Sequence, residues 1–199
     1  MGFGGMLPTV RGAGLSIPNL ITLARILMVP VIIWAIASNR MQVAFALFLV
    51  AGLSDLVDGF LAKRFGMATE LGAYLDPLAD KAMIVSIYVA LGISDIIPRW
   101  LVILVVSRDI MIVAAVILSW LVDKPVKLKP LMVSKLNTVA QVLLALLVLA
   151  SLSIRFEAGI AIDVLTVVVA TLTLLSVAFY VAAWVRHMNM PNPAGNKQV

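Results

Sequence analysis

The sequence predicts an all-α integral membrane protein with six transmembrane helices and both termini in the cytoplasm. Three observations predict this fold class: the composition, six long apolar segments, and an uneven distribution of basic residues. The 199-residue chain is 63% hydrophobic and only 13% charged, whereas an ordinary globular protein is about 25% charged. A soluble domain of this length cannot bury so much apolar surface, so we expect lipid to cover it.

Six segments of the chain are long and apolar enough to cross a bilayer, which takes about 20 residues of helix. Turn-forming or charged residues separate them. The segments cover residues 19–38, 41–63, 70–93, 98–121, 132–153 and 160–185. We expect residues 1–15 to form an N-terminal tail, residues 16–186 to form one membrane domain, and residues 187–199 to form a C-terminal tail.

Basic residues distinguish the two sides of the membrane. Six spans place both termini on one side, and that side holds nine cations against three on the other. The nine are Arg11, Lys63, Arg64, Lys124, Lys127, Lys129, Lys135, Arg186 and Lys197, and the three are Arg40, Arg99 and Arg155. Because cytoplasmic loops carry the excess of Lys and Arg, the termini are predicted to be cytoplasmic. These scattered cations form no basic face, so no nucleic-acid partner is expected.

Carboxylates inside the apolar segments are the strongest functional signal, since each intramembrane charge costs roughly 2.5–3.5 kcal/mol. Asp55 and Asp58 lie three residues apart in the second segment, and Asp76 and Asp80 lie four apart in the third. Each pair therefore shares one helix face. The short connection between the two segments predicts that their helices are antiparallel neighbours. The four acids are then expected to converge on one pocket near the cytoplasmic surface.

Such a cluster predicts a divalent metal site. Four like charges in a low-dielectric pocket repel one another unless cations neutralise them. All-oxygen ligands favour Mg²⁺ or Mn²⁺ over zinc, and two such ions suit a displacement at phosphorus. Gly59, Ala62 and Gly72 leave space beside the acids for a nucleotide. The chain contains no cysteine and no nucleophile–His–carboxylate set, which favours direct in-line attack over a covalent intermediate.

Acidic residues inside apolar segments have two other common roles. A single intramembrane Asp is often a paired structural group, but that reading does not account for four acids at matched spacing and depth. A proton- or cation-coupled transporter also uses intramembrane Asp. Six-span transporters usually show internal repeats and helices broken at the midplane, whereas these acids lie near one surface and the sequence shows no repeat.

The acids also belong to a longer pattern that resembles the signature of the CDP-alcohol phosphotransferase family. The pattern is Asp55-Leu-Val-Asp58-Gly59-Phe-Leu-Ala62-Lys63, followed at the family's spacing by Gly72, Asp76 and Asp80. It departs from the signature at Lys63, where the family has arginine. Arg64 follows directly, so either cation is a candidate to meet the donor phosphates. In the first segment, Asn19-Leu-Ile-Thr22-Leu-Ala-Arg25 is similar to a stretch of bacterial members.

This resemblance implies a six-helix homodimer whose active site opens to the cytoplasmic leaflet. It implies that Asp55, Asp58 and Asp76 bind metal, and that Asp80 both binds metal and acts as the general base. The residues expected to line the pocket of a CDP-linked donor are Asn19, Thr22, Gly59, Ala62, Lys63, Arg64, Thr69 and Gly72. A helix N-cap role also explains Asn19, and an ordinary helix position explains Thr22.

The signature does not specify the acceptor alcohol. Ser107-Arg108-Asp109 and Ser134-Lys135-Leu-Asn137-Thr138 resemble stretches of mitochondrial-type cardiolipin synthases and their α-proteobacterial relatives. That resemblance implies a CDP-diacylglycerol donor, a phosphatidylglycerol acceptor, and a bacterial or mitochondrial inner membrane.

Glycerol 3-phosphate stays open as the acceptor. Its phosphate needs cations near the acids, and the sequence contains candidates for that role. The acceptor-site candidates are Arg108, Asp109, Lys129 and Lys135. A structural ion pair is the alternative role for Arg108 and Asp109. Because sequence neighbours point apart on a helix, we expect each of the two to need another partner.

Overall fold

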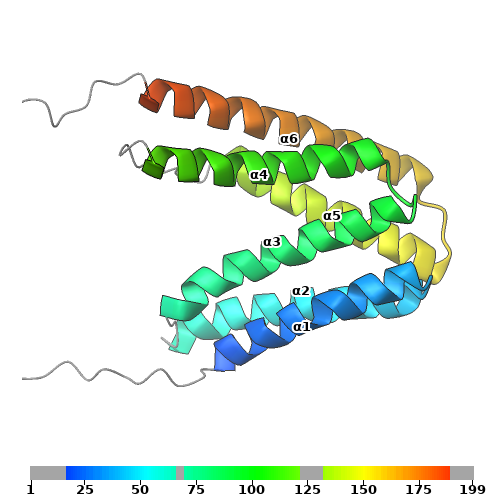
Figure 1. Ribbon diagram of the computed structural model, residues 1–199. Coiled ribbons are helices and arrows are strands. Elements are labelled where there is room, and N and C mark those ends of the chain that lie inside the picture. Colours follow the sequence, from blue (N-terminus) through cyan, green and yellow to red (C-terminus); the bar gives the residue numbers. More distant parts are fainter. Residues whose placement is uncertain (1–16, 66–69, 122–131, 189–199) are drawn as a thin grey trace, which may run out of the picture.

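The structure is a computed structural model that describes residues 17–65, 70–121 and 132–188, and the regular secondary structure in these ranges is entirely helical (Figure 1). The helices are α1 (Ile17–Ala37), α2 (Met41–Phe65), α3 (Glu70–Ile93), α4 (Arg99–Leu121), α5 (Met132–Ile154) and α6 (Gly159–Met188). Each predicted segment corresponds to one of these helices, with ends that differ by at most a few residues. The prediction of six helices is confirmed.

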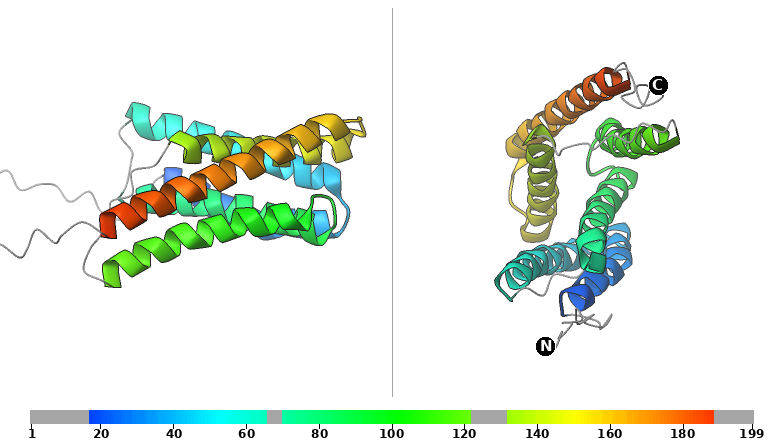
Figure 2. Two further views of the ribbon diagram at one scale, coloured as in Figure 1. Left: turned by 90° about the horizontal axis from the view of Figure 1, so that it is seen from above. Right: turned by 90° about the vertical axis from the view of Figure 1, so that its left-hand side faces the viewer.

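The six helices form a ring when the bundle is viewed along its length (Figure 2). Going around the ring, α1 contacts α3, α3 contacts α4, α4 contacts α6, α6 contacts α5, α5 contacts α2, and α2 returns to α1. A further contact between α3 and α5 crosses the ring. Successive helices run in opposite directions, so the start of α1 and the end of α6 lie at the same end of the bundle (Figure 1).

The predicted direct packing of α2 against α3 is wrong for the described parts of these helices, which make no contact with each other. Helix α1 packs on both of them instead. A short connection fixes only the ends of two helices near each other, and the helices can diverge from there to accept a third between them. Residues of α1 are thereby brought between the acids of α2 and those of α3.

Apolar side chains fill the interior of the ring. Ile36, Ile87, Leu101 and Leu144, from α1, α3, α4 and α5, are each almost fully inaccessible to solvent. Burying such a side chain contributes roughly 1.5–3 kcal/mol. The hydroxyl of Tyr88 donates a hydrogen bond of 3.1 Å to the main-chain carbonyl of Gln141, which joins α3 to α5 across the ring.

Helix α1 ends in a backbone motif that turns the chain directly into α2. Asn39 adopts a left-handed conformation with φ of 56°. Its N–H donates to the carbonyl of Ile36 at 2.9 Å, and the N–H of Arg40 donates to the carbonyl of Ala35 at 2.8 Å. These two bonds are those of a Schellman motif, which satisfies carbonyls that a helix end leaves unpaired. The turn fixes the positions of Asn39 and Arg40 at this end of the bundle.

The outer surface of the bundle is apolar, as a membrane protein requires. Large side chains such as Leu27, Ile103 and Ile160 are 63%, 66% and 85% exposed. Within the described residues, α1, α5 and α6 each contain a stretch long and apolar enough to cross a bilayer, and α2 contains a shorter one. We conclude that the chain is an integral membrane protein. Charged residues interrupt the apolar stretches of α2, α3 and α4, and the candidate site lies there.

Candidate active site

Arg25 of α1 joins the acids of α2 and α3. Its Nη1 atom lies 2.8 Å from Oδ1 of Asp55 and 2.5 Å from Oδ1 of Asp80. Because Nη1 of Arg25 contacts both Oδ1 atoms, these two carboxylate oxygens lie no farther apart than the sum of the two distances. The Arg25 side chain is fully buried, whereas those of Asp55 and Asp80 are 42% and 37% exposed. The acids are therefore held on one side by the guanidinium and remain accessible on the other.

The helix geometry explains why these two acids meet. Asp55 lies ten residues before the end of α2 at Phe65, and Asp80 lies ten residues after the start of α3 at Glu70. At 1.5 Å per residue, both lie about 15 Å from the end of the bundle where the two helices are connected. The prediction that acids of α2 and α3 converge at matched depth is confirmed for this pair, with α1 as the element that brings them together.

The other two acids occupy helix positions close to the first two. Asp58 is one turn beyond Asp55 on α2, and Asp76 is one turn before Asp80 on α3, so both lie nearer the connected ends. Their side chains lie outside the described part of the structure. Among the described residues, no group of three or more potential metal ligands is assembled. The oxygen donors of Asp55 and Asp80 are nevertheless of the type that Mg²⁺ and Mn²⁺ prefer, and they converge on a single positive charge.

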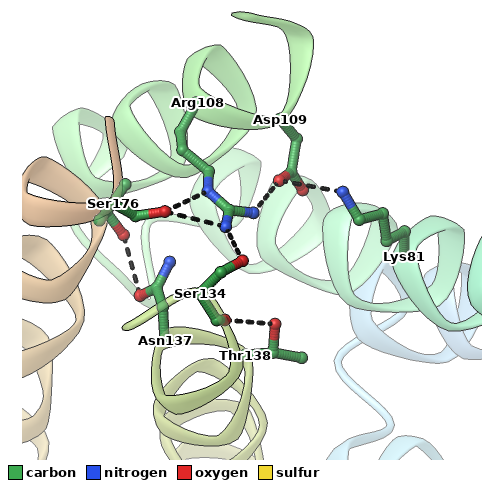
Figure 3. Close-up of polar contacts among 8 residues, drawn as sticks. Lys81, Arg108, Asp109, Ser134, Asn137, Thr138 and Ser176 are labelled. Carbon is green, nitrogen blue, oxygen red and sulfur yellow. Dashed lines mark hydrogen bonds and ion pairs between the residues drawn. The ribbon is translucent and has the colours of Figure 1, made fainter. Parts of the chain in front are cut away.

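A second polar cluster surrounds Arg108 of α4 (Figure 3). The Arg108 side chain is only 3% exposed. Its Nε donates to Oγ of Ser176 at 3.2 Å, and its Nη2 donates to the same oxygen at 3.0 Å and also to Oγ of Ser134. Tyr180 lies beneath the guanidinium, with its ring centre 5.9 Å away. One buried arginine thus ties α4 to α5 and α6.

Asp109 connects this cluster to α3. Its Oδ1 atom accepts from Nη1 of Arg108 and lies 3.5 Å from Nζ of Lys81, so it is shared between two cations (Figure 3). Lys81 follows Asp80 directly in the sequence. Two adjacent residues of α3 therefore belong to different clusters, Asp80 to the cluster around Arg25 and Lys81 to the cluster around Arg108. The polar layer therefore runs from α1 through α3 to α6.

Arg108 and Asp109 contact each other directly, because the long Arg108 side chain reaches back to its sequence neighbour. The expectation that the two point apart is therefore wrong, and the expectation that each has another partner is confirmed. The further partners are both Ser134 and Ser176 for Arg108, and Lys81 for Asp109. The alternative of a structural ion pair describes these contacts, and Arg108 also lines a groove described below.

The polar layer continues between α5 and α6. Oγ1 of Thr173 donates to Oδ1 of Asn137 at 3.1 Å. The side-chain nitrogens of Asn137 and Gln141 are buried and have no hydrogen-bond acceptor within the described ranges. Both residues are on α5 and four positions apart, so they lie on one face of that helix.

An apolar groove of about 250 Å³ lies between α4 and α6. Arg108 lines the part of it nearest the middle of α4, and the rest of its wall extends from there toward the ends of the two helices. That wall consists of Met111, Ile112, Ala114, Ala115, Leu118, Val177, Tyr180, Val181, Trp184 and Val185. The groove is therefore lined by hydrocarbon and aromatic side chains along its length, with the largely buried side chain of Arg108 at one end.

The remaining predicted residues fall into two groups. Thr22 is fully buried on α1, one turn before Arg25, and Lys135 is exposed on α5 beside Ser134. The others cannot be placed by their side chains, since these lie beyond the described part of the structure. They are Asn19, Gly59, Ala62, Lys63, Arg64 and Gly72, which are in helices, and Thr69 and Lys129, which are outside the described ranges.

Three residues that organise the site had no role predicted from the sequence. Arg25 was noted only as the last residue of the stretch that begins at Asn19, although the cost of a charge inside an apolar segment signals that it needs acidic partners. Ser134 and Ser176 carried no comparable signal, because serine is common in membrane helices and its hydroxyl can bond to the helix backbone. Only the packing of α5 and α6 against α4 brings them to Arg108.

Comparisons with known proteins show which sequences this chain resembles. The sequence profile of the CDP-alcohol phosphatidyltransferase family matches residues 15–184. Cardiolipin synthase (CMP-forming) from Rattus norvegicus and its counterpart from Homo sapiens are each 34% identical over 181 residues, which cover 83% of this chain and 60% of the relative. The chloroplastic CDP-diacylglycerol–glycerol-3-phosphate 3-phosphatidyltransferase 1 of Oryza sativa subsp. japonica is 37% identical over 147 residues, 65% of this chain and 45% of the relative. The chain thus spans about 60% of the length of the rat and human cardiolipin synthases.

Proposed function

Since the chain belongs to the CDP-alcohol phosphatidyltransferase family, we propose that it transfers a phosphatidyl group from CDP-diacylglycerol to phosphatidylglycerol, forming cardiolipin and CMP. The observation that carries this proposal is the meeting of Asp55 and Asp80 at Arg25, within 2.8 Å of one nitrogen. Both acids belong to the motif shared with the family, and they come from different helices to one point.

We assign the binding of two Mg²⁺ or Mn²⁺ ions to Asp55, Asp58, Asp76 and Asp80. Metal held by these residues would neutralise the donor diphosphate and the negative charge of the CMP leaving group. The partial exposure of the Asp55 and Asp80 carboxylates supports this assignment, because ligands need an open side. Arg25 holds the two carboxylates together and balances part of their charge before donor and metal bind.

The proposed reaction is a direct in-line displacement at the β-phosphorus of the CDP-linked donor, which bears the diacylglycerol. Asp80 accepts the proton of the acceptor hydroxyl. The acceptor oxygen forms a bond to that phosphorus, and the bond between the phosphorus and the oxygen of CMP breaks. The residues proposed to hold the donor are Asn19, Thr22, Gly59, Ala62, Lys63 or Arg64, Thr69 and Gly72.

The groove between α4 and α6 supports a lipid as the acceptor. Its apolar wall suits an acyl chain, and Arg108 at one end suits the single charge of a phosphodiester. The phosphate of glycerol 3-phosphate is a dianion, so its binding needs two or three cations that acidic side chains do not already neutralise. Near the site, Arg108 and Lys81 already share Asp109, and Lys135 is exposed on α5. The charges around Arg108 therefore match the single negative charge of phosphatidylglycerol better than the dianion of glycerol 3-phosphate. The similarity to the rice enzyme keeps glycerol 3-phosphate as the second candidate.

We further propose that all six helices cross the membrane, with both termini cytoplasmic, and that the enzyme acts as a homodimer. The distribution of cations supports this orientation. It places the connected ends of α2 and α3, and hence the acids, toward the cytoplasmic leaflet of a bacterial or mitochondrial inner membrane. CDP-linked lipid then reaches the site from the cytoplasmic side or its mitochondrial equivalent.

Filling the groove tests the acceptor assignment. Ala114 lines the groove, whereas Val113 is on the same helix, is 54% exposed and does not line it. We expect Ala114→Phe to raise the KM for phosphatidylglycerol about tenfold and to leave the KM for CDP-diacylglycerol unchanged, with Val113→Phe as the matched control. Equal KM values for phosphatidylglycerol in the two variants would contradict a lipid acceptor in this groove.

The chemistry is tested separately with Asp80→Asn and with metal. Asp80→Asn keeps the size of the side chain and removes the base, so turnover should fall by about 10²–10⁴-fold while donor affinity changes much less. Excess EDTA should abolish turnover of the wild-type protein, and added Mg²⁺ or Mn²⁺ should restore it. Undiminished turnover in EDTA would remove metal from the mechanism.

A further inference from the structure

A second cavity lies at the end of the bundle away from the acids. It has a volume of about 470 Å³ and forms where the connection between α1 and α2 meets the end of α5. The residues that line it are Asn39, Arg40, Met41, Gln42, Val43, Leu152, Ser153 and Arg155. Asp55 lies fourteen residues along α2 from Met41, which is about 20 Å of helix. The cavity is thus separate from the proposed active site.

The charge of this cavity is unbalanced. Arg40 and Arg155 line it, and no acidic residue does. Neither arginine forms an ion pair within the described ranges, although Arg99, the third cation at this end, pairs with Asp95 at 2.8 Å. Arg99 is therefore neutralised at this end of the bundle, whereas Arg40 and Arg155 both line the cavity without an ion pair from the described residues. Two guanidinium groups in one hollow attract an anion, and their planar donors match phosphate oxygens.

The cavity also lies at the level expected of lipid headgroups. The Arg40 guanidinium stacks on the ring of Trp34, 5.1 Å from its centre. Trp34 is 53% exposed on an apolar helix face, and tryptophan in membrane proteins concentrates at the boundary between hydrocarbon and headgroups. Arg155 directly follows the last residue of α5, where its φ of 59° continues the chain into the connection to α6. Both arginines are accordingly presented at the rim of the bundle rather than in its hydrocarbon-covered middle.

We propose that this cavity binds the phosphate of an anionic phospholipid, taken from the leaflet opposite to the one that the active site faces. The volume accommodates a phosphodiester with its glycerol substituent, whereas a bare phosphate ion would leave most of it empty. A zwitterionic headgroup would bring its own cation toward the two arginines, so anionic lipids are favoured over phosphatidylcholine. This site goes beyond the proposed transfer reaction and does not depend on it.

Native mass spectrometry of the detergent-solubilised full chain tests the proposal. The probes are phosphatidylglycerol and phosphatidylcholine, added separately to delipidated protein. The test variant is Arg40→Gln combined with Arg155→Gln, and Arg99→Gln is the matched control at the same end of the bundle. We expect the wild type and the control to retain one more phosphatidylglycerol molecule than the double variant, with no such difference for phosphatidylcholine. Equal retention of phosphatidylglycerol by all three proteins would overturn the site.

Two further arms keep the result decisive. Arg155→Gln alone changes only an exposed connection and should weaken the extra binding about fivefold, so it replaces the double variant if that protein does not fold. Inorganic phosphate at millimolar concentration is the competitor that distinguishes a lipid from a free ion. Persistence of the extra lipid in phosphate supports the proposal, and its complete displacement would identify the ligand as free phosphate instead.

Discussion

Replacing Arg25 is the sharpest structural test of how the acids are held. Arg25→Gln removes the one described cation that contacts both Asp55 and Asp80, at 2.8 and 2.5 Å. A hydrogen bond to a charged group contributes roughly 1.5–3 kcal/mol, and removing one partner of a fully buried pair costs about 3–5 kcal/mol. Because the two carboxylates are about 40% exposed, water replaces part of the loss. We therefore expect Arg25→Gln to destabilise the protein by about 2–4 kcal/mol.

The assay is thermal unfolding in detergent, followed by the fluorescence of the four tryptophans. For a chain of about 200 residues, 1 kcal/mol shifts Tm by roughly 2–4 °C, so the expected decrease is about 5–15 °C. Arg25→Lys keeps the charge but not the planar fork and should fall between Arg25→Gln and the wild type. Arg99→Gln breaks an exposed pair and should change stability by less than about 1 kcal/mol.

Divalent metal gives this experiment a second readout. Arg25→Gln removes the positive charge that Arg25 brings to the two carboxylates, so Mg²⁺ should raise the Tm of Arg25→Gln more than that of the wild type. A Tm for Arg25→Gln no lower than that of Arg99→Gln would refute the view that Arg25 holds the acids together. An equal response of Arg25→Gln and wild type to Mg²⁺ would refute the view that Arg25 balances part of the charge of these acids.

The other predictions concern packing and topology. A Cβ atom at Gly92 would lie 2.6 Å from Cγ2 of Val102, so Gly92→Ala should separate α3 from α4 and cost about 1–3 kcal/mol in thermal unfolding. The matched control is Gly52→Ala, where nothing lies within 4 Å and a gain of about 0.5–1 kcal/mol in helix stability is expected. In this cysteine-free chain, a single cysteine at Lys127 should react with an impermeant reagent only from the cytoplasmic side, and one at Asn39 only from the opposite side. Labelling of both positions from one side would contradict the six-span topology.

The helices could be predicted almost completely because their signals are local. Long apolar segments bounded by turn residues identified α1 to α6, and the bounds of α3 were predicted as residues 70–93. The depth of Asp55 and Asp80 was also predictable, since it depends only on counting residues from a shared connection. The carboxylates, their spacing and the charge of the site can be read directly from the sequence.

The partners across helices could not be predicted, because they depend on which helices pack together. The connection between α2 and α3 was taken to force those helices into contact, yet α1 packs on both and Arg25 reaches both acids. The direct contact of Arg108 with Asp109 was missed because spacing rules describe where side chains start and not how far a long one bends back. The groove between α4 and α6 likewise exists only once the ring is closed.

Product identity tests the central claim most directly. Purified protein in detergent is given Mg²⁺ and radiolabelled CDP-diacylglycerol with either phosphatidylglycerol or glycerol 3-phosphate, and the lipids are separated by chromatography, with Asp80→Asn as the blank. We predict cardiolipin and CMP in equal amounts from phosphatidylglycerol, and no product from glycerol 3-phosphate. Phosphatidylglycerophosphate from glycerol 3-phosphate, without cardiolipin from phosphatidylglycerol, would contradict the proposed acceptor, and no CMP release with either alcohol would contradict the proposed transfer.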